Sequence, residues 1–177
     1  MVAATTRRII FVPGKNLKPP VAEHRAQLFR CLVHGVGRAD PDAARAIANA
    51  PDMFMTIPWN PLYYGAVKPL GPDQPWIDAL LTRDGPTADE VREALSWRRK
   101  AAWAMISAAD FLPLLIPLLP DPAVKSAIQE TERYFANFGG IGGRVRELLK
   151  TPLREMLARG ERVLLIGHSM GSVIAYD

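Results

Sequence analysis

Cysteine and histidine are scarce in this sequence. Cys31 is its only cysteine and its three histidines stand far apart, at positions 24, 34 and 168. One thiol cannot form an internal disulfide, which favours a reducing compartment, and we expect a cytoplasmic protein. Without a Cys/His cluster at zinc spacing, the sequence predicts no metal site, and none of its motifs calls for a cofactor.

Long hydrophobic runs and clustered positive charge are also lacking. The most apolar stretch, residues 101–124, is interrupted by four prolines and two aspartates, so a helix there could not satisfy its backbone in lipid and no transmembrane segment is expected. Residues 1–8 lack the apolar core of a secretion signal. The net charge is +4, but the basic residues are scattered without interleaved aromatics, so we expect no nucleic-acid partner.

Ordinary globular composition accompanies these absences. Apolar residues make up 49% of the chain and the mean hydropathy is zero, which is typical of one soluble domain with a real core. Three short runs rich in branched and sulfur-containing residues predict strands at 8–12, 53–57 and 162–166. The first and third runs are continuously apolar, a pattern typical of central parallel strands that are buried on both faces.

Helical patterns lie between and after these strands. Apolar residues at three- and four-residue spacing over 28–36 predict a first helix that begins near Pro20, and Asp40 with Pro41 predicts a second. Strand, helix and strand then form a parallel crossover unit. From about residue 59 to residue 143 the regular alternation of strand and helix patterns stops. We therefore predict one domain, residues 1–177, with a helical insertion over this stretch.

The insertion contains its own turn and helix-start signals. Turn-forming residues predict loops over 58–61 and 68–72, and the capping box of Thr87 and Glu90 predicts a helix running towards Ala102 or beyond. Further helices are predicted from Asp121 to about 137, and from 145 to about 160 with a kink or restart at Pro152, separated by a glycine-rich break at 139–143. The apolar segment 111–120 fits a lid, a membrane contact or the insertion's own core, and the residues leave these open.

The strongest chemical signal is a serine between two glycines. The strand 162–166 leads into Gly167-His168-Ser169-Met170-Gly171, and small and apolar residues then begin a helix. A serine at a sharp strand-to-helix turn projects its hydroxyl beyond the carboxyl edge of the sheet, and glycines on either side let the flanking backbones approach closely. Ser169 is therefore the candidate nucleophile, with Gly167 and Gly171 as the glycines of its turn.

At residues 162–176 the chain resembles the esterase- and lipase-like members of the α/β-hydrolase family, in which this turn often reads Gly-His-Ser-Met-Gly. The resemblance is looser at Ile9 to Asn16, where Pro13 stands in place of the family's usual histidine. It implies a partial α/β-hydrolase fold, with central parallel strands, crossover helices, a lid-like insertion, and the first strand between the other two. It also implies backbone N–H groups of Met170 and Lys15 as the oxyanion hole, and a small-molecule ester or acyl compound as the parent enzyme's substrate.

The other members of a catalytic triad are not found. In this family the acid and the histidine follow the serine, but only eight residues follow Ser169 and none is a histidine. His168 should turn away from the serine hydroxyl, His24 and His34 should lie on a helix surface, and Asp177 should point away. We therefore expect this chain to be the amino-terminal portion of a serine hydrolase and poorly active alone.

Two other functions stay open. The strand at 162–166 would leave an apolar open edge, so a non-catalytic binding or assembly module could use that edge to pair with itself or with a partner. The Gly14 turn after the first strand could also belong to a nucleotide-binding domain, although this is a lone match to such a pattern.

Overall fold

The structure is a computed structural model that describes residues 6–97, 99–100 and 122–177. The chain divides into two compact units. One comprises residues Met1–Leu81 and Arg133–Asp177, and it holds every strand described below. The other comprises residues Thr82–Glu132.

A three-stranded parallel sheet organises the first unit. Its strands are β1 (Arg7–Val12), β2 (Phe54–Thr56) and β3 (Arg162–Gly167), in the order β2-β1-β3. The three predicted strands are thus confirmed, and β1 is central as expected. The prediction that β3 is also central is wrong for the described chain, in which β3 pairs with β1 alone. An apolar run reports which faces of a strand are apolar and carries no information on how many strands flank it.

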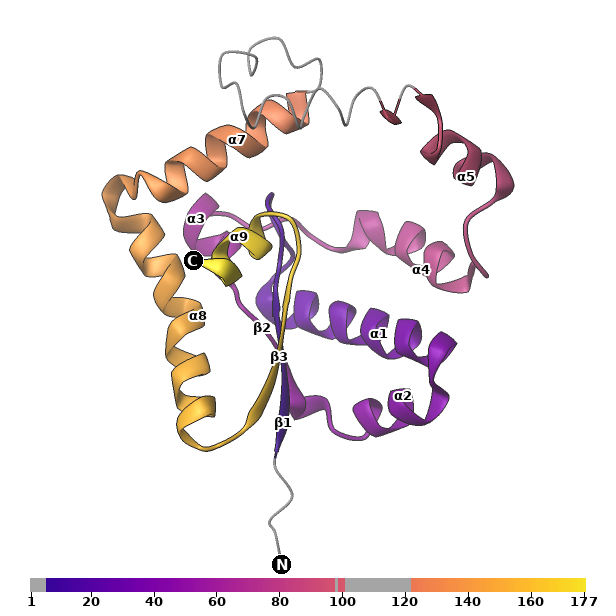
Figure 1. Ribbon diagram of the computed structural model, residues 1–177, viewed down its shortest axis with the longest axis horizontal. Helices are drawn as coiled ribbons and strands as arrows, with labels where there is room; N and C mark the ends of the chain where they lie inside the picture. Colours follow the sequence, from indigo (N-terminus) through magenta and orange to yellow (C-terminus); the bar gives the residue numbers. More distant parts are fainter. Residues whose placement is uncertain (1–5, 98, 101–121) are drawn as a thin grey trace, which may run out of the picture. The chain divides into compact units, whose positions relative to one another are not determined.

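Helices cover both faces of this sheet (Figure 1). Helices α1 (Val21–Ala39) and α2 (Pro41–Ala48) lie on one side, and α8 (Ile141–Ala158) lies on the other. As predicted, Asp40 begins α2, because its side chain accepts hydrogen bonds from the backbone nitrogens of Asp42 and Ala43 at 3.0 and 2.9 Å. The last helix, α9 (Met170–Tyr176), follows β3 directly.

Two segments that begin with turn-forming residues differ from the loop prediction. Residues 59–61 of the first predicted loop form the start of α3 (Trp59–Tyr64). Residues 71–72 of the second predicted loop lie in a short 3-10 helix, η2 (Gly71–Asp73), which leads into α4 (Gln74–Thr82). Pro61 and Pro75 stand in the first turns of α3 and α4. The N–H groups of a first turn have no partner within the helix, so proline is tolerated there as readily as in a loop. A further 3-10 turn, η1 (Pro51–Met53), precedes β2.

The second unit confirms one helix start and corrects its length. Helix α5 (Ala88–Ala94) begins at the predicted capping box, in which Thr87 Oγ1 accepts from the Glu90 nitrogen at 3.3 Å and the Glu90 carboxylate accepts from the Thr87 nitrogen at 2.8 Å. The predicted run towards Ala102 is interrupted at residue 95. Ser96 Oγ accepts from the Arg99 nitrogen at 3.4 Å, so this serine starts a new turn instead of continuing the helix.

The predictions on either side of residue 121 have different outcomes. Asp121 and the apolar segment 111–120 lie outside the described residues. Helix α7 (Pro122–Phe135) begins at the predicted proline and ends two residues before the predicted end at 137.

The predicted glycine break at 139–143 is confirmed at η4 (Phe138–Gly140), in which Gly139 and Gly140 have left-handed φ angles of 59° and 74°, but residues 141–143 already belong to α8, which begins four residues before the predicted start at 145. Helix α8 then runs on through Pro152 without restarting there. Buried residues on both sides of the proline, Leu149 and Met156, hold the two halves of the helix against the sheet.

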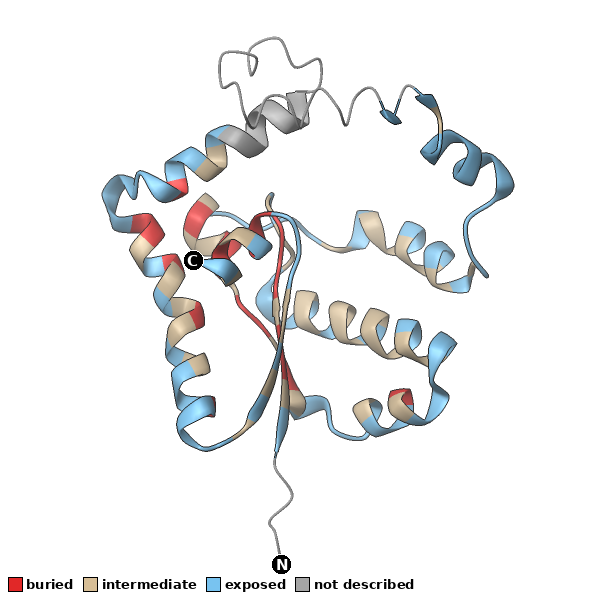
Figure 2. Cartoon of the chain, viewed as in Figure 1, coloured by how far each residue is buried: buried red, intermediate tan, exposed pale blue. Residues whose placement is uncertain are grey.

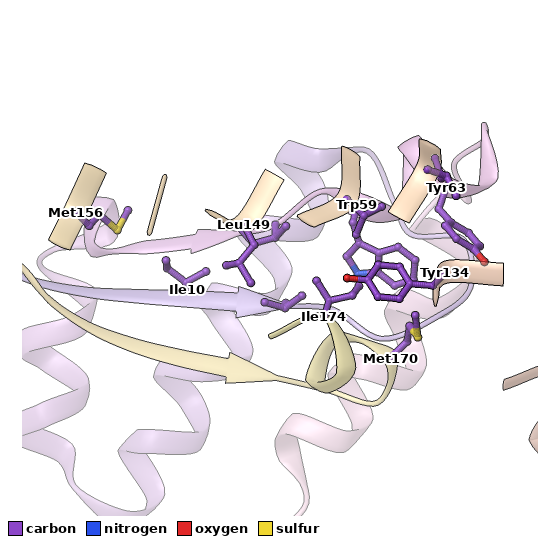
Figure 3. Close-up of a cluster of buried hydrophobic side chains, with 12 residues drawn as sticks. Ile10, Trp59, Tyr63, Tyr134, Leu149, Met156, Met170 and Ile174 are labelled. Atoms are coloured by element: carbon purple, nitrogen blue, oxygen red, sulfur yellow. The ribbon is translucent and has the colours of Figure 1, made fainter. Parts of the chain in front are cut away.

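The main hydrophobic core lies between the sheet and α8 (Figures 2 and 3). It joins Ile10 and Val12 of β1 to Val145 and Leu149 of α8, and the largest fully buried side chains are Trp59 and Tyr134. Met170 and Ile174 of α9 enter the same cluster, so the segment that follows β3 is packed against the core. None of the helices that the structure describes is both long enough and apolar enough to cross a membrane.

Candidate functional site

Ser169 occupies a strained turn at the carboxyl end of β3. Its φ and ψ are 53° and −123°, a combination that residues other than glycine rarely adopt and that costs on the order of 1–3 kcal/mol. The turn is closed by the Gly171 nitrogen, which donates to the His168 carbonyl at 2.9 Å, and by the Ser172 nitrogen, which donates to the Ser169 carbonyl at 2.8 Å. The side chain of Ser169 is exposed, so this costly backbone conformation presents a hydroxyl to solvent.

The two glycines of the turn are required by close backbone contacts. A Cβ atom added to Gly171 would lie 2.0 Å from the carbonyl oxygen of Val12, and one added to Gly167 would lie 2.7 Å from the Cα of Ser172. Real Cβ atoms essentially never approach another atom so closely, and backbone atoms cannot move aside as side chains do. The spacing of glycines around Ser169 therefore has the steric basis that the sequence suggested.

The loop after β1 lies directly against this turn. A Cβ atom added to the buried Gly14 would lie 3.1 Å from the Cβ of Ser169 and 2.7 Å from Nδ1 of His168. The His168 nitrogen also donates to the Val12 carbonyl at 3.1 Å. The structure therefore brings together the two segments that contain the predicted oxyanion donors, Lys15 and Met170.

Two buried side chains of α3 hold that loop in place. Trp59 Nε1 donates to the Pro13 carbonyl at 2.7 Å, and Asn60 Nδ2 donates to the carbonyls of Gly14 and Asn16 at 2.8 and 3.0 Å. Trp59 and Asn60 are each only 1% exposed. Within the described chain, Asn60 Oδ1 is a buried acceptor without a hydrogen-bond partner, so the amide is held by its donor side alone.

Further contacts complete this arrangement. The Asn16 nitrogen donates to the Tyr64 hydroxyl at 3.0 Å, and Asn16 itself has a left-handed φ of 75°. Lys18 Nζ donates to the Lys15 carbonyl at 2.7 Å, and partial burial lowers the pKa of this ammonium group. The four carbonyls from Pro13 to Asn16 thus all accept hydrogen bonds.

One of these bonds bears on the proposed chemistry. The Gly14 carbonyl and the Lys15 N–H belong to the same planar peptide group, so the direction of one determines the direction of the other. By donating to that carbonyl, Asn60 orients the N–H that the resemblance assigns to the oxyanion hole.

The sequence does not predict the role of α3, because the turn-forming residues at its start indicate a loop. A usable signal was present, since Trp59 and Asn60 follow β2 at the carboxyl edge of a parallel sheet, where open α/β sheets bind ligands. The sequence also raised two readings for the aromatic group that follows β2, a pocket lining or a loop support. Trp59 and Tyr64 support the loop, whereas Trp76 is 66% exposed.

The histidines do not complete a triad in the described chain. His168 is exposed and its ring lies against Gly14, and His34 is exposed on α1. His24, predicted on the helix surface, is half-buried, and burial together with the charge of Lys18 lowers its pKa to about 4. Among the described residues, none of the histidines or carboxylates makes a hydrogen bond to the Ser169 hydroxyl.

Asp177 is engaged elsewhere, in agreement with its predicted direction. Its carboxylate accepts from the hydroxyl of the buried Tyr134 at 2.9 Å and from Nε of Arg146. The Arg146 and Tyr134 hydrogen bonds lower the pKa of Asp177, whereas burial, followed by the hydrogen bond to Asp177, raises the pKa of Tyr134. This carboxylate therefore ties the end of α9 to α8.

Comparison with known proteins yields no relative. No family model, curated protein or solved structure matches the chain. In the described part of the chain, no three His, Cys, Asp or Glu side chains are grouped as metal ligands.

Proposed function

We propose that Ser169 is the nucleophile of a serine hydrolase that acts on an ester or a related carboxylic substrate. The observation that carries this proposal is the strained φ of 53° at an exposed serine, placed at the carboxyl end of a strand and between two glycines that close contacts require. Strain of this kind persists only where the surrounding structure enforces it, and it concentrates at functional sites.

The proposed reaction is acyl transfer to water. Ser169 Oγ attacks the ester carbonyl carbon, and the carbonyl oxygen gains negative charge that the backbone N–H groups of Met170 and Lys15 stabilise. When this intermediate collapses, the bond to the leaving alcohol breaks and the alcohol takes up the serine's proton. Water then cleaves the acyl-serine and releases the carboxylic acid.

The proton of Ser169 needs a base, and the described residues place none on its hydroxyl. A serine hydroxyl is a weak nucleophile without a neighbouring base, so we expect the 177-residue chain to react slowly. Backbone donors alone retain part of the rate advantage, because an oxyanion hole still stabilises the transition state when triad members are missing.

A fluorophosphonate probe tests the proposal. Trypsin releases residues 163–177 as one peptide, since neither lysine nor arginine follows Arg162, and tandem mass spectrometry then locates the label within it. We expect slow labelling of Ser169, at least about tenfold faster than that of the exposed Ser172 in the same peptide. The rate should rise with pH and show no plateau near the pKa of a histidine.

Two variants serve as controls. Ser169→Ala should reduce labelling of the peptide to the slow rate of Ser172, and Ser172→Ala should leave labelling of Ser169 unchanged. If Ser169 and Ser172 react equally slowly, the turn is only structural and the proposal is wrong. Rapid labelling with a plateau near neutral pH would instead contradict the expectation that this chain lacks a base.

A further inference from the structure

A groove of about 1040 Å³ lies at the amino ends of the strands, in the unit that holds the sheet. One wall is formed by α2 and η1, with Ala46 and Ile47 among its residues, and the other by the first residues of β1 and β3. Ser169 follows the carboxyl end of β3, at the opposite edge of the sheet. Six strand residues span about 20 Å, so the groove is well separated from the candidate nucleophile.

The sheet side of the groove is apolar. Leu164 of β3 is the register partner of Ile9 in β1, and both residues line the groove. Ile9 is buried, but Leu164 is 57% exposed, because β3 is an edge strand. A ligand with a hydrocarbon portion would remove this apolar surface from water.

One end of the groove carries like charges that the described chain leaves unpaired. Arg7 and Arg162 are register partners on adjacent strands, and both are exposed. In the described part of the chain neither forms an ion pair, whereas the adjacent Arg8 binds Glu161 at 3.0 Å and the Asp52 carbonyl at 2.8 Å. Like charges directly opposite each other on neighbouring strands repel, and an anion between them would relieve that repulsion.

The groove as a whole has a positive charge balance. Three arginines line it, and Asp52 is the one acidic residue among its described lining residues. The guanidinium group is planar and binds carboxylate or phosphate through paired hydrogen bonds. An apolar wall beside two such groups fits a ligand that combines an alkyl chain with an anionic head.

We propose that this groove is a second site, apart from Ser169, that binds an amphiphile with a carboxylate or phosphate head. The head lies between Arg7 and Arg162, and the alkyl chain covers Leu164 and extends along α2. This inference does not depend on the chemistry of Ser169.

Isothermal titration calorimetry with four probes that carry a ten-carbon chain tests the site, with decanol kept below its solubility limit and the charged probes below their micelle concentrations. We expect decanoate and decyl phosphate each to bind once per chain. Decanol and decyltrimethylammonium should bind at least tenfold more weakly, because they lack the negative charge. Tighter binding of decanoate assigns a carboxylate as the preferred head, and tighter binding of decyl phosphate assigns a phosphate ester.

Variants identify the residues responsible. The double variant Arg7→Gln with Arg162→Gln should weaken decanoate binding at least tenfold. Arg144→Gln should leave it unchanged, since Arg144 is also exposed and forms no ion pair in the described chain. Leu164→Asn should weaken decanoate binding and should not strengthen decanol binding. Circular dichroism confirms that each variant is folded.

Three results would overturn the inference. The first is equal binding of all four probes, which would mean that head charge is not recognised. The second is unchanged decanoate binding by the double arginine variant. The third is a wild-type chain that sediments as a dimer and becomes monomeric on Leu164→Asp, since a second copy would then cover the groove.

Discussion

Replacing Asn60 by aspartate would test how firmly the loop beside Ser169 is held. The asparagine donates two buried hydrogen bonds, to the carbonyls of Gly14 and Asn16 at 2.8 and 3.0 Å. Aspartate has nearly the same shape, but its ionised carboxylate cannot donate, so both carbonyls lose their donor. A hydrogen bond contributes about 1 kcal/mol and a buried polar group left unsatisfied costs about 1–3 kcal/mol. We therefore expect Asn60→Asp to lower the free energy of unfolding by about 2–4 kcal/mol at pH 7.

The pH dependence of this loss has a definite sign. Burial against two carbonyl oxygens raises the folded-state pKa of the introduced carboxyl group above its unfolded value of about 3.9. Between these two pKa values the folded state binds more protons than the unfolded state, so stability rises as the pH falls. The protonated carboxyl also donates one hydrogen bond, and the cost of Asn60→Asp should therefore shrink towards pH 4.

Urea denaturation at pH 7 and pH 5, followed by circular dichroism, measures both effects. Asn49→Asp is the matched control, because Asn49 is exposed just after α2, and its substitution should change stability by less than about 1 kcal/mol. The reasoning fails if the two variants are equally stable at pH 7, or if the cost of Asn60→Asp grows as the pH falls.

Three further predictions concern the turn and a histidine. Gly171→Ala places a Cβ 2.0 Å from the carbonyl oxygen of Val12, so it should lower the free energy of unfolding by about 3 kcal/mol or more in urea denaturation. Gly35→Ala, within α1 and with open space around it, should instead raise the free energy of unfolding by up to about 1 kcal/mol. Equal effects of the two substitutions would contradict the close contact at Gly171. Ser169→Gly should be about 1 kcal/mol more stable than Ser169→Ala, since glycine accepts a φ of 53°, and no difference would mean no strain. The pKa of His24 is about 4 in the folded state and 6.5 in the unfolded state, so stability should fall as the pH drops from 6.5 towards 4. Because the imidazole of His24 is partly exposed, we expect this loss to be about 1 kcal/mol. His24→Gln should flatten that slope and His34→Gln should not.

Local chemistry explains which parts of the fold could be predicted from the sequence. The strands were recognised from apolar runs ended by turn residues, and Asp40 and Thr87 from the hydrogen bonds that their side chains can accept at a helix start. The loop prediction for residues 58–61 was wrong at residues 59–61, which begin α3, because the pattern around Pro61 fits a loop and the first turn of a helix equally well. The prediction of one continuous helix beyond Leu95 was wrong because Ser96 competes for the backbone as a new cap, so that the described residues after it begin a separate helical turn.

In the candidate site, too, the features set by local sequence could be predicted and those set by distant residues could not. The turn at Ser169 follows from five consecutive residues, so its spacing alone predicted it. The support from Trp59 and Asn60 depends on hydrogen bonds between residues 44 to 46 positions apart, and no local pattern reports which distant carbonyl an amide will meet. The position of β3 at an edge is likewise a property of the whole sheet.

Packing beneath Ser169 explains how the strained turn persists. Helix α9 has seven residues, too few to be stable alone, so it depends on the burial of Met170 and Ile174 beside Trp59 and Tyr134 (Figure 3). Burying these two side chains contributes about 3–6 kcal/mol together, which exceeds the roughly 1–3 kcal/mol of strain at the turn. Relaxing the backbone at Ser169 would pull both side chains out of the core. The exposed hydroxyl is therefore held by the core beneath it.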